Sequence, residues 1–212
     1  WAEKNRLKLI PNPLPYSVNE NNITIDRKKK EVIFVGRVIE LKRVWYLLEA
    51  WKMIEDKVPD WKFRVVGDGA FLENEKKHAE ELSIKNIVFE GFKEAKPYMQ
   101  EASVLMMASS QEGFCMVIAE AQQCGCVPVV TDSFPAVHDL IQDGRNGVLT
   151  SDNDIKEFAE AVYHLICHEE QRKKLAKAAM VDSQRFSVAS ICDQWESLFK
   201  TVKICRKYGS QI

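Results

Sequence analysis

Short runs of apolar residues alternate with stretches of helical periodicity along most of the chain. The runs are three to five residues long and end in glycine or polar residues, which is typical of buried strands. Between them, apolar residues recur every three or four positions, as on one face of a helix. The pattern predicts strands over 32–35, 63–66, 87–89, 103–107, 127–130 and 147–149. It predicts intervening helices over 41–57, 72–82, 94–101, 116–124 and 135–141.

The composition of the predicted strands indicates the fold class. The strands are apolar on both faces, which is typical of a parallel sheet covered by helices on each side. Because crossovers between parallel strands are right-handed, we expect an α/β fold: a doubly wound parallel sheet of Rossmann type, with added C-terminal helices. In such a sheet ligands bind beyond the carboxyl ends of the strands, so candidate functional residues should follow the strands directly.

The two ends of the chain depart from this alternation. Three prolines between positions 11 and 15 exclude a helix interior, so we interpret residues 1–31 as an extended linker followed by a polar loop. Beyond the sixth strand only helical periodicity remains, and Asp152, Asn153 and Ser187 are candidate N-caps. The helices expected there cover 155–168, 169–184 and the stretch after Ser187.

Composition narrows the possible classes of protein. The chain has 212 residues and a formal net charge of −1, from 30 basic and 31 acidic side chains. A hydrophobic content of 46% and a charged content of 29% exclude a disordered chain, a collagen and a coiled coil. The balanced charge argues against a nucleic-acid-binding protein, and no apolar run approaches the roughly 18 residues of a membrane span. Because the first residue is Trp1, we expect a piece of a longer protein.

The six cysteines do not form a metal or disulfide pattern. None belongs to a Cys-x-x-Cys pair, and no histidine stands at zinc-ligand spacing from a pair. We interpret them as free thiols that pack as small apolar groups, which implies a reducing, cytoplasmic compartment. His164 and His168 lack the glutamate of a His-Glu-x-x-His site, so we expect no metal site. The cysteines are Cys115, Cys124, Cys126, Cys167, Cys192 and Cys205.

Two candidate loops follow the first two strands. After the first, Gly36 allows a tight turn, and Arg37 and Lys42 place two cations near the carboxyl edge of the sheet. These cations suit a diphosphate, although two solvated surface cations explain the same spacing. After the second strand, Gly67 and Gly69 form a tight turn that does not match the dinucleotide-binding fingerprint. This turn is either structural or lets a ligand approach the backbone closely.

Two glutamates after the fourth strand suggest an extended ligand. Glu112 and Glu120 are eight residues apart, which is about 12 Å along a helix and farther than the pair of a glycosidase. Gly113 indicates that Glu112 lies in a loop and Glu120 in a helix that begins near Cys115. The amino end of that helix can bind a phosphate. An acid, an anion site and a second acid, in this order, suit a sugar, a diphosphate and a ribose. The alternative interpretation is a core helix with two exposed acids and no ligand.

Taken in order, these motifs resemble the carboxyl-terminal, donor-binding domain of retaining glycosyltransferases of the GT-B fold, in the group 1 or family 4 type with a Glu-x7-Glu motif. The resemblance implies an interdomain linker over 1–31 and a Rossmann-like nucleotide-sugar-binding domain over 32–186. It also implies a terminal helix over 187–212 that crosses to an absent N-terminal domain. The segments that carry the resemblance are 10–13, 36–42, 66–69, 89–92, 112–120, 143–149 and 186–187.

The resemblance implies roles for these residues. The enzyme would transfer a sugar from a nucleotide diphosphate sugar to a saccharide, lipid or other acceptor, with retention of configuration and without a metal or other cofactor. Arg37 and Lys42 would neutralise the leaving diphosphate. Glu112 would position the donor sugar through its hydroxyl groups, and Glu120 would hold the ribose. The other implied donor-binding positions are Gly36, Gly67, Phe92, Gly113, Phe114, Cys115, Met116 and Val117.

The sequence departs from the family pattern at several positions. Cys115 and Arg43 stand where the family usually has glycine, and His138 and Asp139 replace a usual Pro-Glu pair. We expect Cys115 to narrow the sugar pocket, and Arg43 to add either a cation at the site or only a surface charge. Two other functions stay open: a GT-B-fold epimerase of sugar nucleotides, and a noncatalytic α/β module that binds a partner.

The expected partners are the nucleotide sugar and the acceptor-binding N-terminal domain of the full-length chain, not nucleic acid. The expected location is the cytoplasm, with a peripheral association of the full-length enzyme at the membrane face left open. The expected role is polysaccharide biosynthesis. Because the acceptor site belongs to the absent domain, we expect this chain to bind the donor without transferring the sugar by itself.

Overall fold

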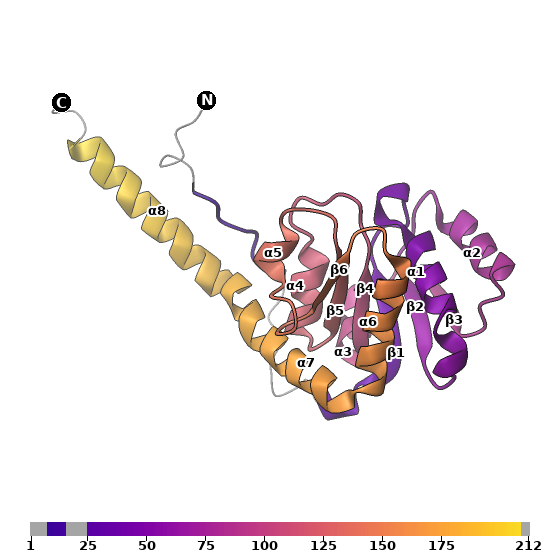
Figure 1. Cartoon of the computed structure of the whole chain (residues 1–212). Coiled ribbons are helices and arrows are strands. Elements are labelled where there is room, and N and C mark those ends of the chain that lie inside the picture. The colour runs from indigo at the N-terminus through magenta and orange to yellow at the C-terminus, as the bar shows by residue number, and fades with distance from the viewer. Residues whose placement is uncertain (1–7, 16–24, 209–212) are drawn as a thin grey trace.

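The six strands in the described part of the chain form one parallel sheet (Figure 1). The computed structural model describes residues 8–15 and 25–208, of which 203–208 are described only as helix backbone. The strand order β3-β2-β1-β4-β5-β6 is that of a doubly wound sheet of Rossmann type, so the expected fold class is confirmed. The strands are β1 (Lys29–Val35), β2 (Lys62–Val66), β3 (Ile87–Gly91), β4 (Ala102–Met107), β5 (Val127–Asp132) and β6 (Val148–Ser151).

Helices cover both faces of the sheet (Figure 1). Because the strand order runs outward from β1 in both directions, right-handed crossovers place α1 and α2 on one face and α3 and α4 on the other. α6 packs against α1, and α7 packs against α4. The helices are α1 (Val44–Lys52), α2 (Leu72–Glu81), α3 (Ala95–Glu101), α4 (Met116–Gln123), α5 (Val137–Leu140), α6 (Ile155–Cys167), α7 (Glu169–Ser183) and α8 (Val188–Tyr208).

Apolar residues of the central strands form the core between these layers. All six residues of β4 are buried, and so is β1 from Glu31 onward. Aromatic rings fill the space beside α1: the centroids of Tyr46 and Phe158 are 5.5 Å apart, and those of Trp51 and Phe63 are 6.0 Å apart. None of these four residues is more than 1% exposed. Large buried rings of this kind contribute strongly to the hydrophobic stabilisation of the domain.

The predicted helix over 41–57 is wrong in its extent. The chain forms a 3-10 turn at Glu40–Lys42, then α1 at Val44–Lys52, then a second 3-10 turn at Glu55–Lys57. The break before α1 occurs at Arg43, whose φ of +47° lies in the left-handed region. A residue in that conformation cannot continue a right-handed helix, although the apolar periodicity runs through it.

The predicted N-caps of α6 are wrong, whereas the predicted N-cap of α8 is confirmed. α6 is capped by Asp154, whose carboxylate accepts a hydrogen bond of 3.0 Å from the amide of Glu157. The expected caps, Asp152 and Asn153, instead accept hydrogen bonds from a side chain in another loop. The hydroxyl of Ser187 caps α8 as predicted, by accepting a hydrogen bond of 3.3 Å from an amide of the first turn.

The linker meets the start of the last helix. A 3-10 turn at Ile25–Arg27 and the first residues of β1 occupy the end of the predicted polar loop. The amide of Leu14 donates a hydrogen bond of 2.8 Å to the carbonyl of Phe186, after which α8 extends away from the sheet (Figure 1). Neither α8 nor any other helix in the described chain is long and apolar enough to cross a membrane. The parts of the expected linker and terminal helix that lie outside the described residues are 1–7, 16–24 and 209–212.

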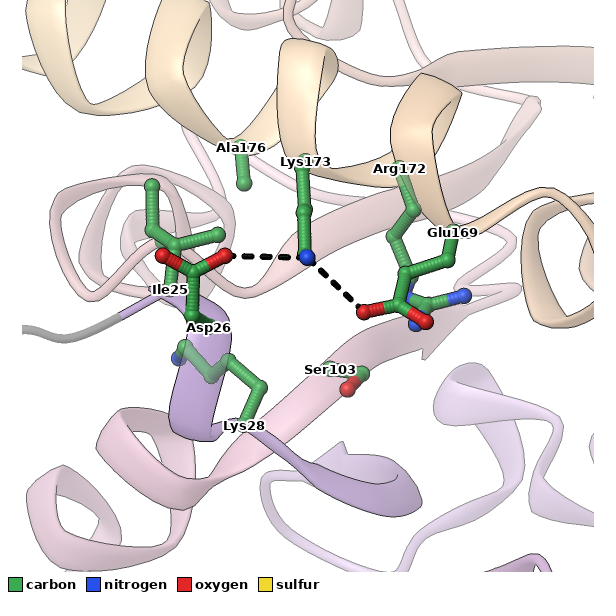
Figure 2. A pocket seen from close by; sticks show the side chains of 9 residues that line it. Ile25, Asp26, Lys28, Ser103, Glu169, Arg172, Lys173 and Ala176 are labelled. Carbon is green, nitrogen blue, oxygen red and sulfur yellow. Dashed lines mark ion pairs between the residues drawn. The ribbon is translucent and has the colours of Figure 1, made fainter.

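Lysine side chains hold the amino end of the sheet together. Lys28, directly before β1, donates hydrogen bonds of 2.9 and 2.6 Å to carbonyl oxygens near the ends of α3 and α4, and its burial lowers its pKa. Lys173 on α7 pairs at 2.9 Å with both Asp26 and Glu169 (Figure 2). The pocket between these residues has a volume of about 20 Å³, which is room for one water molecule and too small for a sugar nucleotide.

Backbone contact joins the loops that follow β1 and β2. The amide of Val38 donates a hydrogen bond of 2.9 Å to the carbonyl of Asp68. Gly67 has a φ of +149°, and a Cβ atom there would lie 1.8 Å from the carbonyl oxygen of Gly36. Only glycine allows this approach. The turn predicted at Gly67 therefore brings the backbones of two loops together at the carboxyl edge of the sheet.

Gly67→Ala should lower the free energy of unfolding by about 2–5 kcal/mol, because the added methyl group meets backbone atoms and the left-handed φ disfavours alanine. The matched control is Gly113→Ala, since a Cβ atom at Gly113 meets nothing within 4 Å. That change should shift stability by less than about 1 kcal/mol. Urea unfolding measures both variants, and a Gly67→Ala protein as stable as the unmodified chain would contradict the contact.

Candidate functional site

The loops that follow β1 and β4 meet at the carboxyl edge of the sheet. These two strands are neighbours where the strand order reverses, which is the place at which doubly wound sheets bind their ligands. The amide of Ser110 in the second loop donates a hydrogen bond of 2.8 Å to the carbonyl of Leu41 in the first. This contact fixes the two loops that carry the expected catalytic residues against each other.

Lys42 and Glu112 meet at this junction. The ammonium group of Lys42 donates a hydrogen bond to Oε1 of Glu112, although the residues are 70 positions apart in sequence. Their side chains are only 14% and 13% exposed, so solvent screens the pair weakly. Each charge is neutralised by the other. A phosphate group that approached Lys42 would offer it a second anionic partner and would release Glu112 to accept hydrogen bonds from hydroxyl groups.

Arg37 lies on the same loop as Lys42 but is exposed. Within the described residues it forms no ion pair. Its planar guanidinium group can therefore form a bidentate contact with an incoming phosphate. The structure thus brings together two of the three expected catalytic residues and leaves the third beside them on an exposed turn.

The helix α4 begins directly after the Glu112 loop, as predicted. Its N-cap residue is Cys115, which has a left-handed φ of +52° and forms no side-chain capping hydrogen bond. The amides of Met116 and Val117 at the positive end of the helix dipole are therefore not used by a side-chain cap. Such a helix start is suited to bind an anion, and it lies next to the Lys42–Glu112 pair.

The thiol of Cys115 is buried beside Glu112. Cys115 is 7% exposed, and burial together with the charge of Glu112 raises its pKa to about 12. The thiol is therefore protonated at neutral pH and is not a nucleophile. Cys115 belongs to the hydrophobic core, and the narrowing of the sugar pocket expected from it stays a prediction.

The two glutamates occupy different environments. Glu112 lies in the loop and Glu120 lies inside α4, as the position of Gly113 predicted. Glu120 is half-buried, and burial raises its pKa. It forms no ion pair within the described chain. A partly buried carboxylate without a cation gains most from hydroxyl groups that donate hydrogen bonds to it, so Glu120 suits a diol better than a phosphate.

The other expected donor-binding residues lie along the same edge. Gly67 follows β2 and Phe92 follows β3, and Phe92 is 86% exposed, so its ring is free to contact a ligand. Phe114 packs edge to face against Phe186, with ring centroids 5.4 Å apart. This contact joins the Glu112 loop to the segment that leads into α8.

Arg43 has a role that sequence reasoning missed. It was expected to add a cation at the site or a surface charge, but it is 8% exposed and its guanidinium group binds acceptors at the carboxyl ends of β4, β5 and β6. The sequence feature that indicated this role is that Arg43 stands where the family pattern usually has glycine. An arginine there adopts a backbone conformation that glycine prefers, and therefore needs strong support from its side chain.

Comparison with protein families identifies the relatives of this chain. The model of the family described as glycosyl transferases group 1 matches residues 17–181. This chain belongs to that family. The match includes every strand of the sheet and both loops of the site.

Individual relatives agree with this assignment. The chain is 27% identical over 203 residues to an uncharacterized glycosyltransferase of Haemophilus influenzae. The alignment includes 93% of this chain and 57% of that protein. The C-terminal domain of the group 1 family protein LpcC from Francisella tularensis superimposes with a TM-score of 0.71 at 23% identity, over 82% of this chain and 97% of that domain. The pneumococcal O-GlcNAc transferase GtfA, in complex with UDP and GlcNAc, gives a TM-score of 0.77 at 20% identity, over 91% of this chain and 38% of that enzyme.

These likenesses show the GT-B type of fold. They also show that this group 1 chain spans little more than half the length of the Haemophilus relative. No group of three or more His, Cys, Asp or Glu residues in the described chain is arranged to hold a metal ion. The metal independence expected from the sequence stays a prediction.

The described cysteines should react with iodoacetamide according to their burial. The thiols of Cys115, Cys124 and Cys126 are buried, whereas Cys167 and Cys192 are exposed. At pH 8 the exposed pair should be alkylated in the native chain and the buried three only after unfolding, because the thiolate is the reactive form. Peptide mass spectrometry measures each site. Alkylation of Cys115 as fast as that of Cys167 would contradict its buried, protonated state.

Proposed function

We propose that this chain is the donor-binding half of a retaining glycosyltransferase, which transfers a sugar from a nucleotide diphosphate sugar to a saccharide, lipid or other acceptor. The observation that carries the proposal is the meeting of Lys42 and Glu112 beside the start of α4, at the point where the strand order reverses. One small region of the molecule then offers a cation, an acid and free amide donors. A diphosphate joined to a sugar needs these three kinds of contact.

Lys42 and Arg37 act on the diphosphate. When the bond between the sugar and the diphosphate breaks, negative charge builds up on the leaving phosphate, and these two cations with the amide groups of α4 stabilise it. In this mechanism Lys42 shifts its interaction from Glu112 to the phosphate. Because the two side chains and the helix end neutralise the leaving group, the reaction needs no metal ion.

Glu112 and Glu120 then bind two different parts of the donor. Once Lys42 contacts phosphate, Glu112 accepts hydrogen bonds from hydroxyl groups of the donor sugar. These bonds orient the anomeric carbon of the sugar toward the acceptor. Glu120, which lies farther along α4, accepts hydrogen bonds from the ribose diol. Its carboxylate is half-buried and has no cationic partner in the described chain, which suits this role. The nucleobase lies toward the exposed turn at Phe92.

The acceptor is held by an N-terminal domain of the full-length enzyme. Two observations support this part of the proposal: the chain covers 57% of the length of its Haemophilus relative, and α8 carries exposed apolar side chains. Trp195 and Phe199 lie against each other with centroids 5.7 Å apart and are 43% and 56% exposed. An aromatic pair exposed on a helix is suited to pack against another domain.

The proposal predicts that the chain binds a nucleoside diphosphate. UDP is the first probe because GtfA, which shares the fold, was solved in complex with UDP. Arg37→Ala and Lys42→Ala should each weaken UDP binding about tenfold or more, since each removes a charge-assisted contact. Isothermal titration calorimetry measures the dissociation constants.

The matched control is Lys62→Ala. Lys62 is an exposed lysine that begins β2, at the opposite edge of the sheet, so this variant should bind UDP as the unmodified chain does. If the unmodified chain binds neither UDP nor GDP, or if the Arg37 and Lys42 variants bind as tightly as the control, the proposed site is wrong.

The chain alone should bind the donor without transferring its sugar. Transfer requires the acceptor to be oriented against the donor sugar, and a separate domain supplies that orientation. An acceptor that is free in solution lacks it. The chain is incubated with UDP-sugars and candidate glycan acceptors. Release of UDP is measured, and chromatography detects any glycosylated product. Turnover by this chain at the rate of a full-length group 1 enzyme would show that the acceptor site lies within it.

A further inference from the structure

Arg43 is a buried cation directly beside the proposed donor site. It is 8% exposed, its guanidinium carbon lies 5.6 Å from the centroid of the Tyr46 ring, and its backbone is left-handed. Lys42, the last residue of the 3-10 turn, directly precedes Arg43 in sequence. A buried arginine in a backbone conformation that disfavours it persists only when its partners hold it there.

The partners of Arg43 come from three strand ends. Its Nε donates a hydrogen bond to the carbonyl of Ala108, which directly follows β4. One terminal nitrogen donates to Asn153 at 3.0 Å, and the other to Asp152 at 2.7 Å, both directly after β6. The second nitrogen also lies 3.4 Å from the hydroxyl of Thr131 in β5. One side chain from the β1 loop therefore links the carboxyl ends of β4, β5 and β6.

The same network continues to the Glu112 loop. The hydroxyls of Thr131 and Ser133 lie 3.0 Å apart, and Ser133 donates a hydrogen bond of 2.5 Å to the carbonyl of Ser109. Arg43 thus holds the carbonyl of Ala108 directly and that of the next residue, Ser109, through the two hydroxyls of Thr131 and Ser133. These are the residues from which the chain turns toward Glu112. Arg43 therefore anchors the loop of Lys42 by its backbone and the loop of Glu112 by its side chain.

We propose that Arg43 is a positioning residue for the donor: its guanidinium fork keeps Lys42 and Glu112 at the spacing that the diphosphate and the sugar require. This inference rests on the proposed function. Arginine is suited to the task because it presents several donors in one plane, whereas lysine presents a single charged group that cannot span acceptors from three strands.

The central test is the affinity for UDP of Arg43→Gly and Arg43→Lys, by calorimetry well below the melting temperature. Glycine accepts the φ of +47° without strain, so the backbone can stay in place while the network is lost. Both variants should bind UDP roughly tenfold more weakly, since misplacing a binding group by about 1 Å has effects of this size or larger. Full affinity of Arg43→Lys would overturn the proposal, because the charge alone would then suffice.

The matched control is Ser83→Gly. Ser83 also has a left-handed φ, of +53°, but it is exposed at the end of α2, so the change removes the same backbone strain away from the site. This variant should keep full affinity for UDP. Amide signals in a nitrogen–proton NMR spectrum give a second readout: those of residues 109–113 should shift in Arg43→Gly, whereas signals from the core strands should not.

Asp152→Ala provides a second route if Arg43→Gly does not fold. It removes one acceptor from the network at a position that the proposed function does not use, and it should weaken UDP binding in the same direction by a smaller factor. If the unmodified chain binds no nucleoside diphosphate, the proposed function fails. If it binds and the Arg43 and Asp152 variants bind equally well while only their melting temperatures fall, Arg43 supports stability alone and the positioning role is wrong.

Discussion

The parallel pairing of β1 with β4 is the contact on which the site depends. In this pairing Val32 lies beside Val104 and Ile33 beside Leu105, and all four side chains are completely buried. The ladder holds the strands about 4.8 Å apart, so their carboxyl ends lie next to each other while the chain continues in opposite directions. Two loops that are about 70 residues apart in sequence are thereby brought close enough for Lys42 and Glu112 to form an ion pair.

Two residues with strained backbones flank that ion pair. Arg43 and Cys115 have φ values of +47° and +52°, and conformations of this kind cost about 1–3 kcal/mol each for residues other than glycine. Both residues are buried, at 8% and 7% exposure. Burial and hydrogen bonding at Arg43, and apolar packing at Cys115, offset this strain. Support from the core therefore holds the site loops in place before any ligand binds.

The near-zero net charge of the chain conceals a local grouping of groups that can bind an anion. Arg37, Lys42 and the start of α4 lie along one edge, and at the opposite edge Lys28 and Lys173 are occupied by backbone carbonyls or carboxylates. At the carboxyl edge, the exposed guanidinium group of Arg37 and the amides at the uncapped start of α4 are open to an approaching anion. In the proposed function this local grouping, rather than the total charge, selects the diphosphate.

The sequence by itself determined the elements and their class, because apolar periodicity reports which faces are buried, and the strands of a doubly wound sheet are buried on both. It also determined that Glu112 lies in a loop and Glu120 in a helix, since a glycine and the following periodicity locate the start of α4. Only the tertiary structure decided that helix 41–57 breaks at Arg43, that Asp152 and Asn153 are not caps, and that Lys42 pairs with Glu112. The acceptors that hold Arg43 are 65 to 110 residues away in sequence, and a local pattern carries no information about partners at that distance.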